Sequence, residues 1–216
     1  MIIKRISCKV KESKKEAFFD HQKQWQPLSE VNGFLGQLGG WSTAEPLTAC
    51  IYSFWKTQRE YAFFMEEIHD EIVDRSGQRG AYESIDIRLF EENLENAGMA
   101  AGILDIVVRA NYIRASLSLV KDAAVRHFAD MQEIVWNPGM QKSEGMLGGT
   151  FAFSQKQRNL CLVLTGWESE AVHRGYMEES LPKLLKMAET KHDVLELTGE
   201  EFKVEEEWRV CPDRSN

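Results

Sequence analysis

The sequence lacks an excess of positive charge. Its 26 Lys and Arg residues are outnumbered by 34 Asp and Glu residues, and the formal net charge at pH 7 is −8. Proteins that bind nucleic acids or anionic membranes present a basic surface, because they must neutralise phosphates. Here the basic residues are scattered among acidic ones, so we expect neither a nucleic-acid nor a membrane partner. No apolar run approaches the roughly 20 residues that span a bilayer.

Patterns for disulfides, metals and common cofactors are also missing. The four cysteines (8, 50, 161 and 211) form no CxxC pair, and the first three lie in strand-like apolar runs, as reduced buried thiols do. The sequence therefore predicts a soluble cytoplasmic protein. The five histidines show no HxH or HExxH spacing, and there is no GxSxG, P-loop or GxGxxG element. We expect no metal site and no cofactor.

What the sequence does contain is an internal repeat. Matching residues occur in the same order in both halves of the chain, and their separation grows from 110 to 115 residues. The pairs are Val10 and Val120, Phe18 and Phe128, Trp25 and Trp136, Leu35 and Leu147, Trp55 and Trp167, Met65 and Met177, and Ile87 and Phe202. Chance would not preserve this order, so the repeat indicates a tandem duplication.

Each repeat has the same predicted order of elements: strand, helix, strand, strand, helix, strand. In the first repeat the strands are expected at 2–11, 34–41, 49–55 and 84–90. This order is typical of a ferredoxin-like βαββαβ unit, an α+β fold with both helices on one face of an antiparallel sheet. We expect a first repeat at 1–92, a linker at 93–102 and a second repeat at 103–216. The apolar run 103–110 has no counterpart in the first repeat and is expected to form an extra strand.

A tryptophan ends the third strand of each repeat. We expect Trp55 and Trp167 to be buried where that strand meets the second helix. That helix carries Tyr61, Phe64 and Met65 on one stripe in the first repeat. In the second repeat we expect Pro182 to kink it.

These features resemble the dimeric α+β barrel superfamily, in which two ferredoxin-like units pair their sheets into a barrel. The pattern of Trp55, Glu60, Tyr61 and Phe64 is similar to that of its antibiotic-biosynthesis-monooxygenase-like branch. The run GFLGQLGGW that ends at Trp41, followed by FWK and later by His-Asp, resembles the YdbC-like proteins, a bacterial group.

The resemblance implies an intrachain barrel with a ligand pocket between helices and sheet in each unit. Some members of the superfamily oxidise polycyclic aromatic molecules without metal or flavin, and others degrade haem. The haem-degrading members carry an Asn where this chain has Ser7, and a helix Trp near the position of Phe64 with a His ten residues later. His69 follows Phe64 by only five residues, so haem degradation is not expected.

His69 and His21 are the residues that distinguish the first repeat. Both lie at or near the inward face of a helix, and their counterparts in the second repeat are Leu181 and Met131. His69 is a candidate acid–base group, with Glu66 one turn back as a partner that would fix its tautomer. The alternative for both histidines is simple packing at the margin between helix and sheet.

Trp41 and Phe64 complete the predicted pocket. With His21 and His69 they would form an apolar cavity suited to a flat, weakly acidic aromatic ligand, because a neutral imidazole can accept a phenolic proton. Aromatic residues at this spacing also form ordinary cores. We expect the pocket in the first half and a second half filled with side chains.

Three functions remain open at this point. The first is a cofactor-independent oxygenase that acts on a small aromatic molecule, with His69 as its acid–base group. The second is a protein that binds a small hydrophobic molecule without catalysis. The third is a structural module without a pocket. Because both units lie on one chain, we expect a monomer with an intrachain pseudo-dimer, which could associate further.

Overall fold

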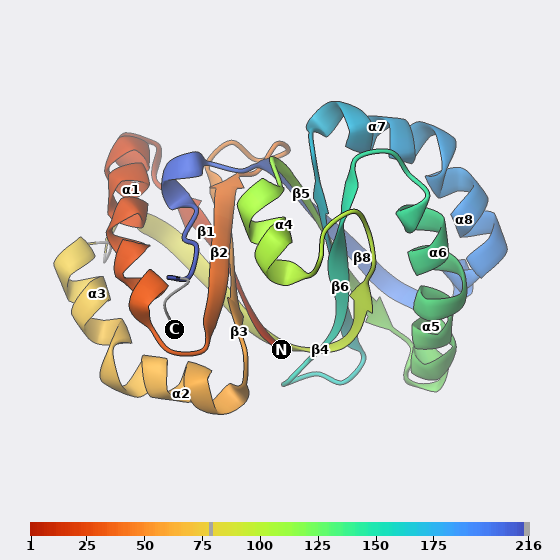
Figure 1. The fold of residues 1–216 in the computed structure, drawn as a ribbon, viewed down its shortest axis with the longest axis horizontal. Coiled ribbons are helices and arrows are strands. Elements are labelled where there is room, and N and C mark those ends of the chain that lie inside the picture. The colour runs from red at the N-terminus through yellow and green to blue at the C-terminus, as the bar shows by residue number, and fades with distance from the viewer. Residues whose placement is uncertain (78–79, 214–216) are drawn as a thin grey trace. The chain divides into compact units, whose positions relative to one another are not determined.

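The computed structural model describes residues 1–77 and 80–213 (Figure 1), and the chain divides into two compact units. Unit 1 comprises Met1–Leu89 together with the chain from Phe202 onwards, and unit 2 comprises Phe90–Glu201. No helix among the described residues is long and apolar enough to cross a membrane.

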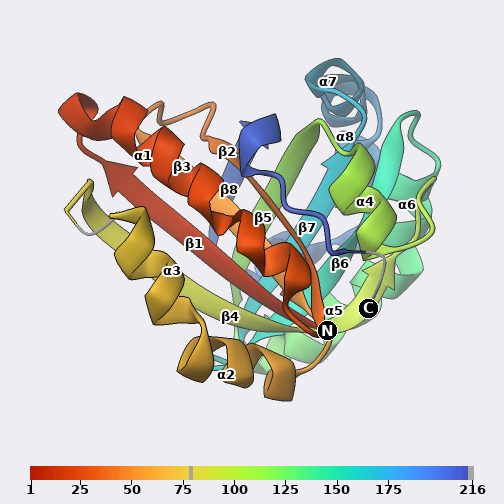
Figure 2. The ribbon, with the colours of Figure 1, turned by 60° about the vertical axis from the view of Figure 1, so that its left-hand side comes forward.

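Unit 1 has the predicted order of strands and helices. Its elements are β1 (Ile2–Val10), η1 (Glu12–Lys14), α1 (Lys15–Gln22), η2 (Lys23–Glu30), β2 (Phe34–Trp41), β3 (Thr48–Trp55), α2 (Gln58–Glu67), α3 (His69–Ser76), β4 (Tyr82–Asn96) and the late turn η6 (Glu206–Trp208). The strand order is β2-β3-β1-β4. Figure 2 shows α1, α2 and α3 in front of the strands of this unit. Residues of η2, α2 and α3 form one buried cluster with the sheet that includes Trp25, Trp55 and Phe64.

Unit 2 repeats this plan. Its elements are the last part of β4, then α4 (Ile103–Arg109), β5 (Tyr112–Val120), η3 (Asp122–Ala124), α5 (Val125–Met131), η4 (Gln132–Trp136), α6 (Asn137–Gln141), β6 (Met146–Ser154), β7 (Leu160–Trp167), α7 (Glu170–Glu179), α8 (Leu181–Ala188), η5 (Thr190–His192) and β8 (Val194–Lys203). The strand order is β4-β6-β7-β5-β8.

Register and irregularities confirm the duplication. The partner of Trp55 on β1 is Ile2, and the partner of Trp167 on β5 is the equivalent residue, Tyr112. Each unit also has a bulge on the strand that follows its first helical segment. Gly36 and Gly148 sit at these bulges with φ of 134° and 142°, which an L side chain rarely adopts.

The second helix is broken at the same place in both units. α2 and α3 meet at Ile68, and α7 and α8 meet at Ser180, which lies 112 residues later. Pro182 occupies the first turn of α8, where its missing N–H costs nothing. Since unit 1 breaks without a proline, the break belongs to the fold and Pro182 is accommodated by it.

Two predicted segments differ from the structure. The expected linker at 93–102 begins as strand, because β4 continues to Asn96 and pairs with β6. The expected extra strand at 103–110 is the helix α4. A continuous apolar run fits either element, and here Asp105 selects the helix, since it bonds Arg109 one turn later (2.9 Å) and the Ala101 N–H before the helix (3.2 Å).

The end of the chain packs in unit 1, although the predicted boundaries place it in the second repeat. Phe202 and Val210 form β-bridges to Ser42 and Gln37. Trp208 is fully buried, and its indole nitrogen donates a hydrogen bond to the Phe19 carbonyl oxygen at 3.1 Å. Unit 1 therefore includes residues from Phe202 onwards, which the sequence repeat assigns to the second half of the chain.

Candidate ligand-binding site

Each unit holds a cavity between its helices and its sheet. The cavity in unit 1 has a volume of about 250 Å³, and the cavity in unit 2 has a volume of about 680 Å³. A structural module without a pocket, the third function left open by the sequence, does not agree with these cavities. The expectation that the second half is filled with side chains is wrong.

The unit 1 cavity is lined by two of the four predicted ligand-binding residues, Phe64 and His69. The His69 ring packs edge-on against Phe64 (5.6 Å between centroids) and lies 5.9 Å from Trp25. Its Nδ1 is 3.0 Å from a carboxylate oxygen of Asp70, the next residue, rather than paired with Glu66 as predicted. The helix break at Ile68 changes the direction of the chain between Glu66 and His69, which explains the difference.

His21 and Trp41 do not line this cavity. Trp41 belongs to a separate aromatic group, with ring centroids 5.8 Å from Phe18 and 5.2 Å from Trp208. The Nδ1 atom of His21 is buried and has no hydrogen-bond partner among the described residues. The four residues therefore do not surround one pocket. The ligand-binding roles of His21 and Trp41 stay predictions.

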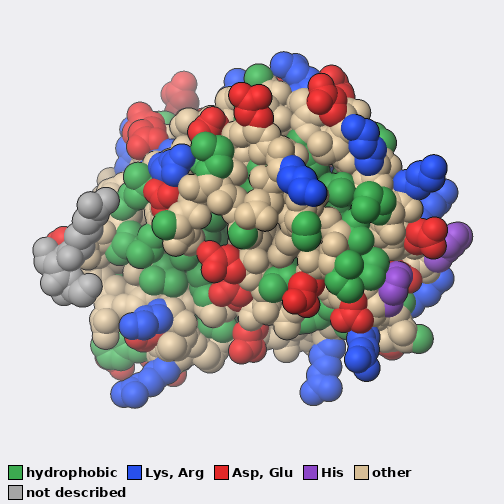
Figure 3. All heavy atoms as spheres, turned by 45° about the vertical axis from the view of Figure 1, so that its right-hand side comes forward, with side chains coloured by type: hydrophobic (Ala, Val, Ile, Leu, Met, Phe, Trp, Pro, Cys, Tyr) green, Lys and Arg blue, Asp and Glu red, His purple; other side chains and the backbone are tan. Residues whose placement is uncertain are grey.

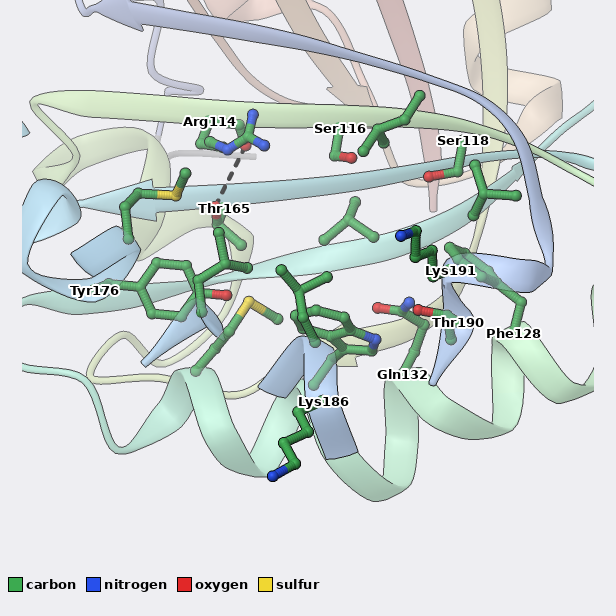
Figure 4. Close-up of a pocket in the computed structure, with 18 of the residues that line it drawn as sticks. Arg114, Ser116, Ser118, Phe128, Gln132, Thr165, Tyr176, Lys186, Thr190 and Lys191 are labelled. Atoms are coloured by element: carbon green, nitrogen blue, oxygen red, sulfur yellow. Dashed lines mark hydrogen bonds between the residues drawn. The ribbon is translucent and has the colours of Figure 1, made fainter. Parts of the chain in front are cut away.

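The larger cavity in unit 2 lies between the sheet and the helices (Figure 4). The sheet side is formed by β5, β7 and β8, and the helical side by α5, η4, α6, α7, α8 and η5. Apolar side chains make up most of its wall. They are Phe128, Trp136, Met140, Val163, Tyr176, Met177, Leu181, Leu185, Val194, Leu195 and Leu197. Three of them are also exposed: Leu185 (49%), Leu195 (59%) and Leu197 (61%). Figure 3 shows hydrophobic side chains on the surface among acidic and basic ones. The three exposed leucines place part of the cavity wall in contact with solvent.

Three buried polar atoms in this wall have no hydrogen-bond partner among the described residues. They are His173 Nε2, Gln132 Oε1 and Trp136 Nε1. An unpaired buried polar atom costs about 1–3 kcal/mol, so most native proteins pair such atoms. The three residues that carry these atoms all line the cavity.

His173 lies on α7, and its ring packs among three aromatic rings. Its ring centroid lies 5.1 Å from Trp167, 5.2 Å from Tyr112 and 6.2 Å from Tyr176, and the residue is only 3% exposed. Burial, helped by the nearby Arg114 guanidinium, lowers the pKa of His173 to about 4, against the opposing effect of Glu201 and Glu170. The imidazole is therefore neutral at pH 7, and Nε2 is free to accept or donate according to its tautomer.

Arg114 and Tyr176 add two further polar groups. The Arg114 Nε lies 3.4 Å from the Oε1 atom of Glu201. The other carboxylate oxygen, Oε2, accepts a hydrogen bond from the Tyr112 hydroxyl (2.8 Å). Burial raises the pKa of Tyr176 to about 12, so its hydroxyl stays protonated. Figure 4 shows this hydroxyl directed toward the cavity from α7, and Gln132 reaching toward the strands from the opposite helix.

The two cavities are built from equivalent positions. Lys4, Ile6 and Cys8 on β1 correspond to Arg114, Ser116 and Ser118 on β5, at an offset of 110 residues. Phe18, Gln22, Trp25 and Phe64 likewise correspond to Phe128, Gln132, Trp136 and Tyr176. Unit 2 therefore has smaller and more polar side chains along its sheet wall.

The helical wall of unit 2 is also longer by one residue. The offset between the repeats rises from 110 at Gln22 and Gln132 to 111 at Trp25 and Trp136. In unit 1 this stretch is the 3-10 helix η2, whereas in unit 2 it is the π-helix η4, whose i→i+5 bonding gives a wider turn. Smaller sheet residues and a wider helical turn together explain the larger cavity.

His173 was not among the residues that the sequence predicted, although the repeat contains the signal. The offset that aligns Trp55 with Trp167 also aligns Tyr61 with His173. Because Tyr61 lies on the inward stripe of its helix, His173 should face inward too. Patterns based on the spacing between histidines do not detect a lone imidazole of this kind.

Thiols and carboxylates contribute little to either cavity. Cys8, Cys50 and Cys161 are buried free cysteines, as predicted, and burial raises the pKa of Cys8 and Cys161 to about 12. Within the described part of the chain, no three His, Cys, Asp or Glu side chains are grouped so that they could hold a metal ion.

Comparison with solved structures identifies the class of protein. A proposed monooxygenase from Lactobacillus acidophilus superposes with a TM-score of 0.74 at 11% identity, covering 97% of this chain and 95% of the other. A proposed monooxygenase from Fusobacterium nucleatum gives 0.76 at 10% identity, with 94% and 91% covered. An anthrone oxidase-like protein gives 0.68 at 12% identity, with 94% and 90% covered. The chain thus has the fold of the antibiotic-biosynthesis-monooxygenase-like dimeric α+β barrel proteins.

The family follows from sequence. Residues 2–90 match the domain of unknown function DUF4937. The uncharacterised protein YdbC of Bacillus subtilis is 41% identical over 95 residues, which are 43% of this chain and 80% of that protein. The chain belongs to the family of YdbC-like proteins, as the motif around Trp41 and Trp55 predicted.

Proposed function

We propose that the chain is a cofactor-independent oxygenase of a small, flat, weakly acidic aromatic molecule, and that the reaction takes place in the unit 2 cavity. The observation that carries this proposal is the set of three unpaired polar atoms, His173 Nε2, Gln132 Oε1 and Trp136 Nε1, on residues of the cavity wall. A volume of about 680 Å³ lies within the range of roughly 300–1,000 Å³ typical of small-molecule sites.

The three atoms define the complementary groups of the ligand. The Trp136 indole N–H needs an acceptor such as a carbonyl or phenolate oxygen, and the Gln132 amide oxygen needs a donor such as a hydroxyl. A hydroxylated polycyclic ketone carries both, and its rings would pack against the aromatic and aliphatic wall. The anthrone oxidase-like neighbour supports this substrate class.

In the proposed reaction His173 accepts a proton from the substrate. Neutral imidazole takes the proton at Nε2, and the resulting imidazolium is stabilised by the substrate anion beside it, which raises its pKa in the complex. The Arg114 guanidinium stabilises the negative charge on the substrate oxygen. For an anthrone, the carbanion at the methylene carbon is then oxidised by O₂. One oxygen atom enters the new carbonyl group, and the other leaves as water.

The proposal is tested by incubating the protein with a hydroxyanthrone under air and measuring O₂ uptake together with the absorbance of the quinone. His173→Gln keeps a hydrogen-bonding side chain but removes the base, and we expect the rate to fall by roughly 10²–10⁴-fold, the usual contribution of a general base. His173→Tyr, which installs the residue of unit 1, is the matched packing control and should lose activity equally. Unchanged O₂ uptake in both variants would overturn the assignment to this cavity.

His69→Leu separates the two cavities. His69 remains the candidate acid–base group of the smaller cavity, and the substitution gives unit 1 the residue found in unit 2. If the reaction takes place in unit 2, this variant should keep the wild-type rate. Loss of turnover in His69→Leu, with turnover of His173→Gln unaffected, would show that the reaction takes place in unit 1 instead.

A protein that binds the same ligand without reaction is the second candidate. The low pKa of His173 favours it, because an imidazole with a pKa of about 4 is a weak base until an anion lies beside it. Quenching of Trp fluorescence by the hydroxyanthrone without any O₂ uptake would identify this function.

A further inference from the structure

We propose that the unit 1 cavity is a carbonyl-binding site, in which the amine of Lys4 condenses with a small apolar aldehyde or ketone to form an imine. The site is separate from the unit 2 cavity, and its chemistry does not depend on the proposed oxygenase reaction.

The position of Lys4 is unusual for a lysine. It lies on β1 with 4% of its surface exposed and is part of the wall of the 250 Å³ cavity. Its Nζ is 3.7 Å from the Met65 sulfur and 5.8 and 5.9 Å from the ring centroids of Tyr61 and Phe64. None of the ion pairs among the described residues includes Lys4, and the residues that line the cavity include no carboxylate.

These surroundings favour the neutral amine, which is the nucleophile. A buried ammonium needs a carboxylate partner to offset its lost hydration, and here the neighbours are a thioether and two ring faces. Burial lowers the pKa of Lys4 from 10.5 to about 8. At pH 7 the neutral fraction is therefore roughly 300-fold larger than for an unperturbed lysine.

The condensation balances within the groups named. The Lys4 nitrogen attacks the carbonyl carbon, a C–N bond forms, and the carbonyl oxygen leaves as water after taking up two protons. In net both come from the amine: a general acid protonates the leaving hydroxyl group and takes up the second amine proton in return. The titratable groups around Lys4 are His69, Cys8 and Tyr82 in the cavity wall and Tyr61 beneath the ammonium. Burial raises the pKa of Cys8 to about 12 and raises that of Tyr61, which makes both weaker proton donors, so we assign the role of general acid to the His69 imidazole in the cavity wall.

Unit 2 provides the natural control. Its residue at the equivalent position is Arg114, whose guanidinium does not lose its proton in proteins and forms no imine of this kind. The volume of 250 Å³ is small for a ligand site, which restricts the ligand to a few carbon atoms or one aromatic ring. The cavity wall is otherwise apolar except for two glutamines and a serine, Gln22, Gln37 and Ser53.

The test is reductive trapping of the full chain with benzaldehyde and cyanoborohydride, followed by peptide mass spectrometry. We expect benzyl addition at Lys4 at least about tenfold faster than at Lys9, an exposed lysine on the same strand, because its neutral fraction is larger. The Lys4 rate should rise with pH and level off above about pH 8.

Two variants complete the test. Lys4→Arg keeps the charge and should abolish the fast site while leaving the circular dichroism spectrum unchanged. Arg114→Lys places an amine in the equivalent position of unit 2, where a second fast site would show that this position in the fold activates lysines. Labelling of Lys4 no faster than that of Lys9 would overturn the proposal, as would fast labelling that persists in Lys4→Arg.

Discussion

The indole Nε1 of Trp167 donates a hydrogen bond to the hydroxyl Oγ1 of Thr165 at 3.0 Å, two residues earlier on the same strand. Trp55 and Ser53 repeat this bond in unit 1 at 3.2 Å, and both indoles are fully buried. A buried Trp needs a partner for its N–H, and a hydroxyl at this spacing lies on the same face of the strand. The duplication has kept the indole together with its acceptor.

Replacing either indole should be costly. Trp55→Ala or Trp167→Ala should reduce the free energy of unfolding by roughly 3–5 kcal/mol, the range for deleting a core aromatic side chain. Trp167→Phe keeps most of the buried area but loses the hydrogen bond, and should cost about 1–3 kcal/mol. Urea denaturation followed by circular dichroism measures both. A loss below about 1 kcal/mol in the alanine variants would contradict the core position of these residues.

The buried His173 should make the protein less stable in mild acid. Its folded-state pKa of about 4 is below the unfolded value of 6.5, so between these values the unfolded chain binds the proton and the folded chain does not. Stability should fall as pH drops from 6.5 toward 4, by about 2 kcal/mol at pH 5 and about 3 kcal/mol in total. His173→Gln has no such proton, so the difference between wild type and variant across this pH range isolates the effect. A constant difference would show that the imidazole is not desolvated.

Lys4→Met should stabilise the protein at pH 7. The substitution replaces a buried ammonium with an apolar side chain of similar length, and we expect a gain of about 1–3 kcal/mol. Because the folded pKa of about 8 lies below 10.5, the wild type recovers stability as pH rises between these values, and the gain should shrink below about 1 kcal/mol near pH 10. The matched control is Lys9→Met, where the side chain is exposed. Destabilisation by Lys4→Met at pH 7 would mean that the ring and sulfur contacts outweigh desolvation.

Two glycines of unit 2 should respond in opposite ways to alanine. At Gly148 the φ of 142° is strained for any L side chain, and an added Cβ would approach the Asn96 carbonyl oxygen and the Ile106 side chain at 3.1 Å. Gly148→Ala should cost about 1–3 kcal/mol. Gly175 lies within α7 with nothing within 4 Å of an added Cβ, and Gly175→Ala should gain roughly 0.5–1 kcal/mol. Chemical denaturation of the two variants checks this contrast, and effects of the same sign would refute it.

The chain should be monomeric in solution. Both units are on one chain, so no second chain is needed to supply a unit. Light scattering should give a mass near 24.8 kDa. A mass twice as large at micromolar concentration would show further association.

The fold was largely predictable because the repeat checks each element twice. The strands containing Trp41, Trp55 and Trp167 were placed from short-range alternation and confirmed by their counterparts. Segments without a counterpart had no such check. The sequence therefore predicts a strand at residues 103–110, although the four-residue spacing of Asp105 and Arg109 is that of an ion pair on a helix. The return of Trp208 to unit 1 depends on contacts between residues nearly 200 positions apart, which local patterns do not contain.

The candidate site was less predictable for a different physical reason. His21 and His69 suggested that the first repeat held the pocket, but cavity volume depends on side-chain size and backbone geometry on both walls. Ser116 and Ser118 in place of Ile6 and Cys8, and the π-helical turn at Gln132, enlarge the other unit. The unpaired state of His173 Nε2 is a property of three-dimensional packing.

The one-residue difference between η2 and η4 has a consequence for how the two halves diverged. A point substitution alters one contact, but an added residue inside a helix rotates everything after it by about 100° unless a wide turn absorbs it. In η4 the π-turn absorbs it, and Trp136 and Met140 keep their inward positions. Two copies of a duplicated unit can thus differ in pocket size through a length change of a single codon. Deleting one residue within 133–135 should accordingly move the second pocket back toward the size of the first.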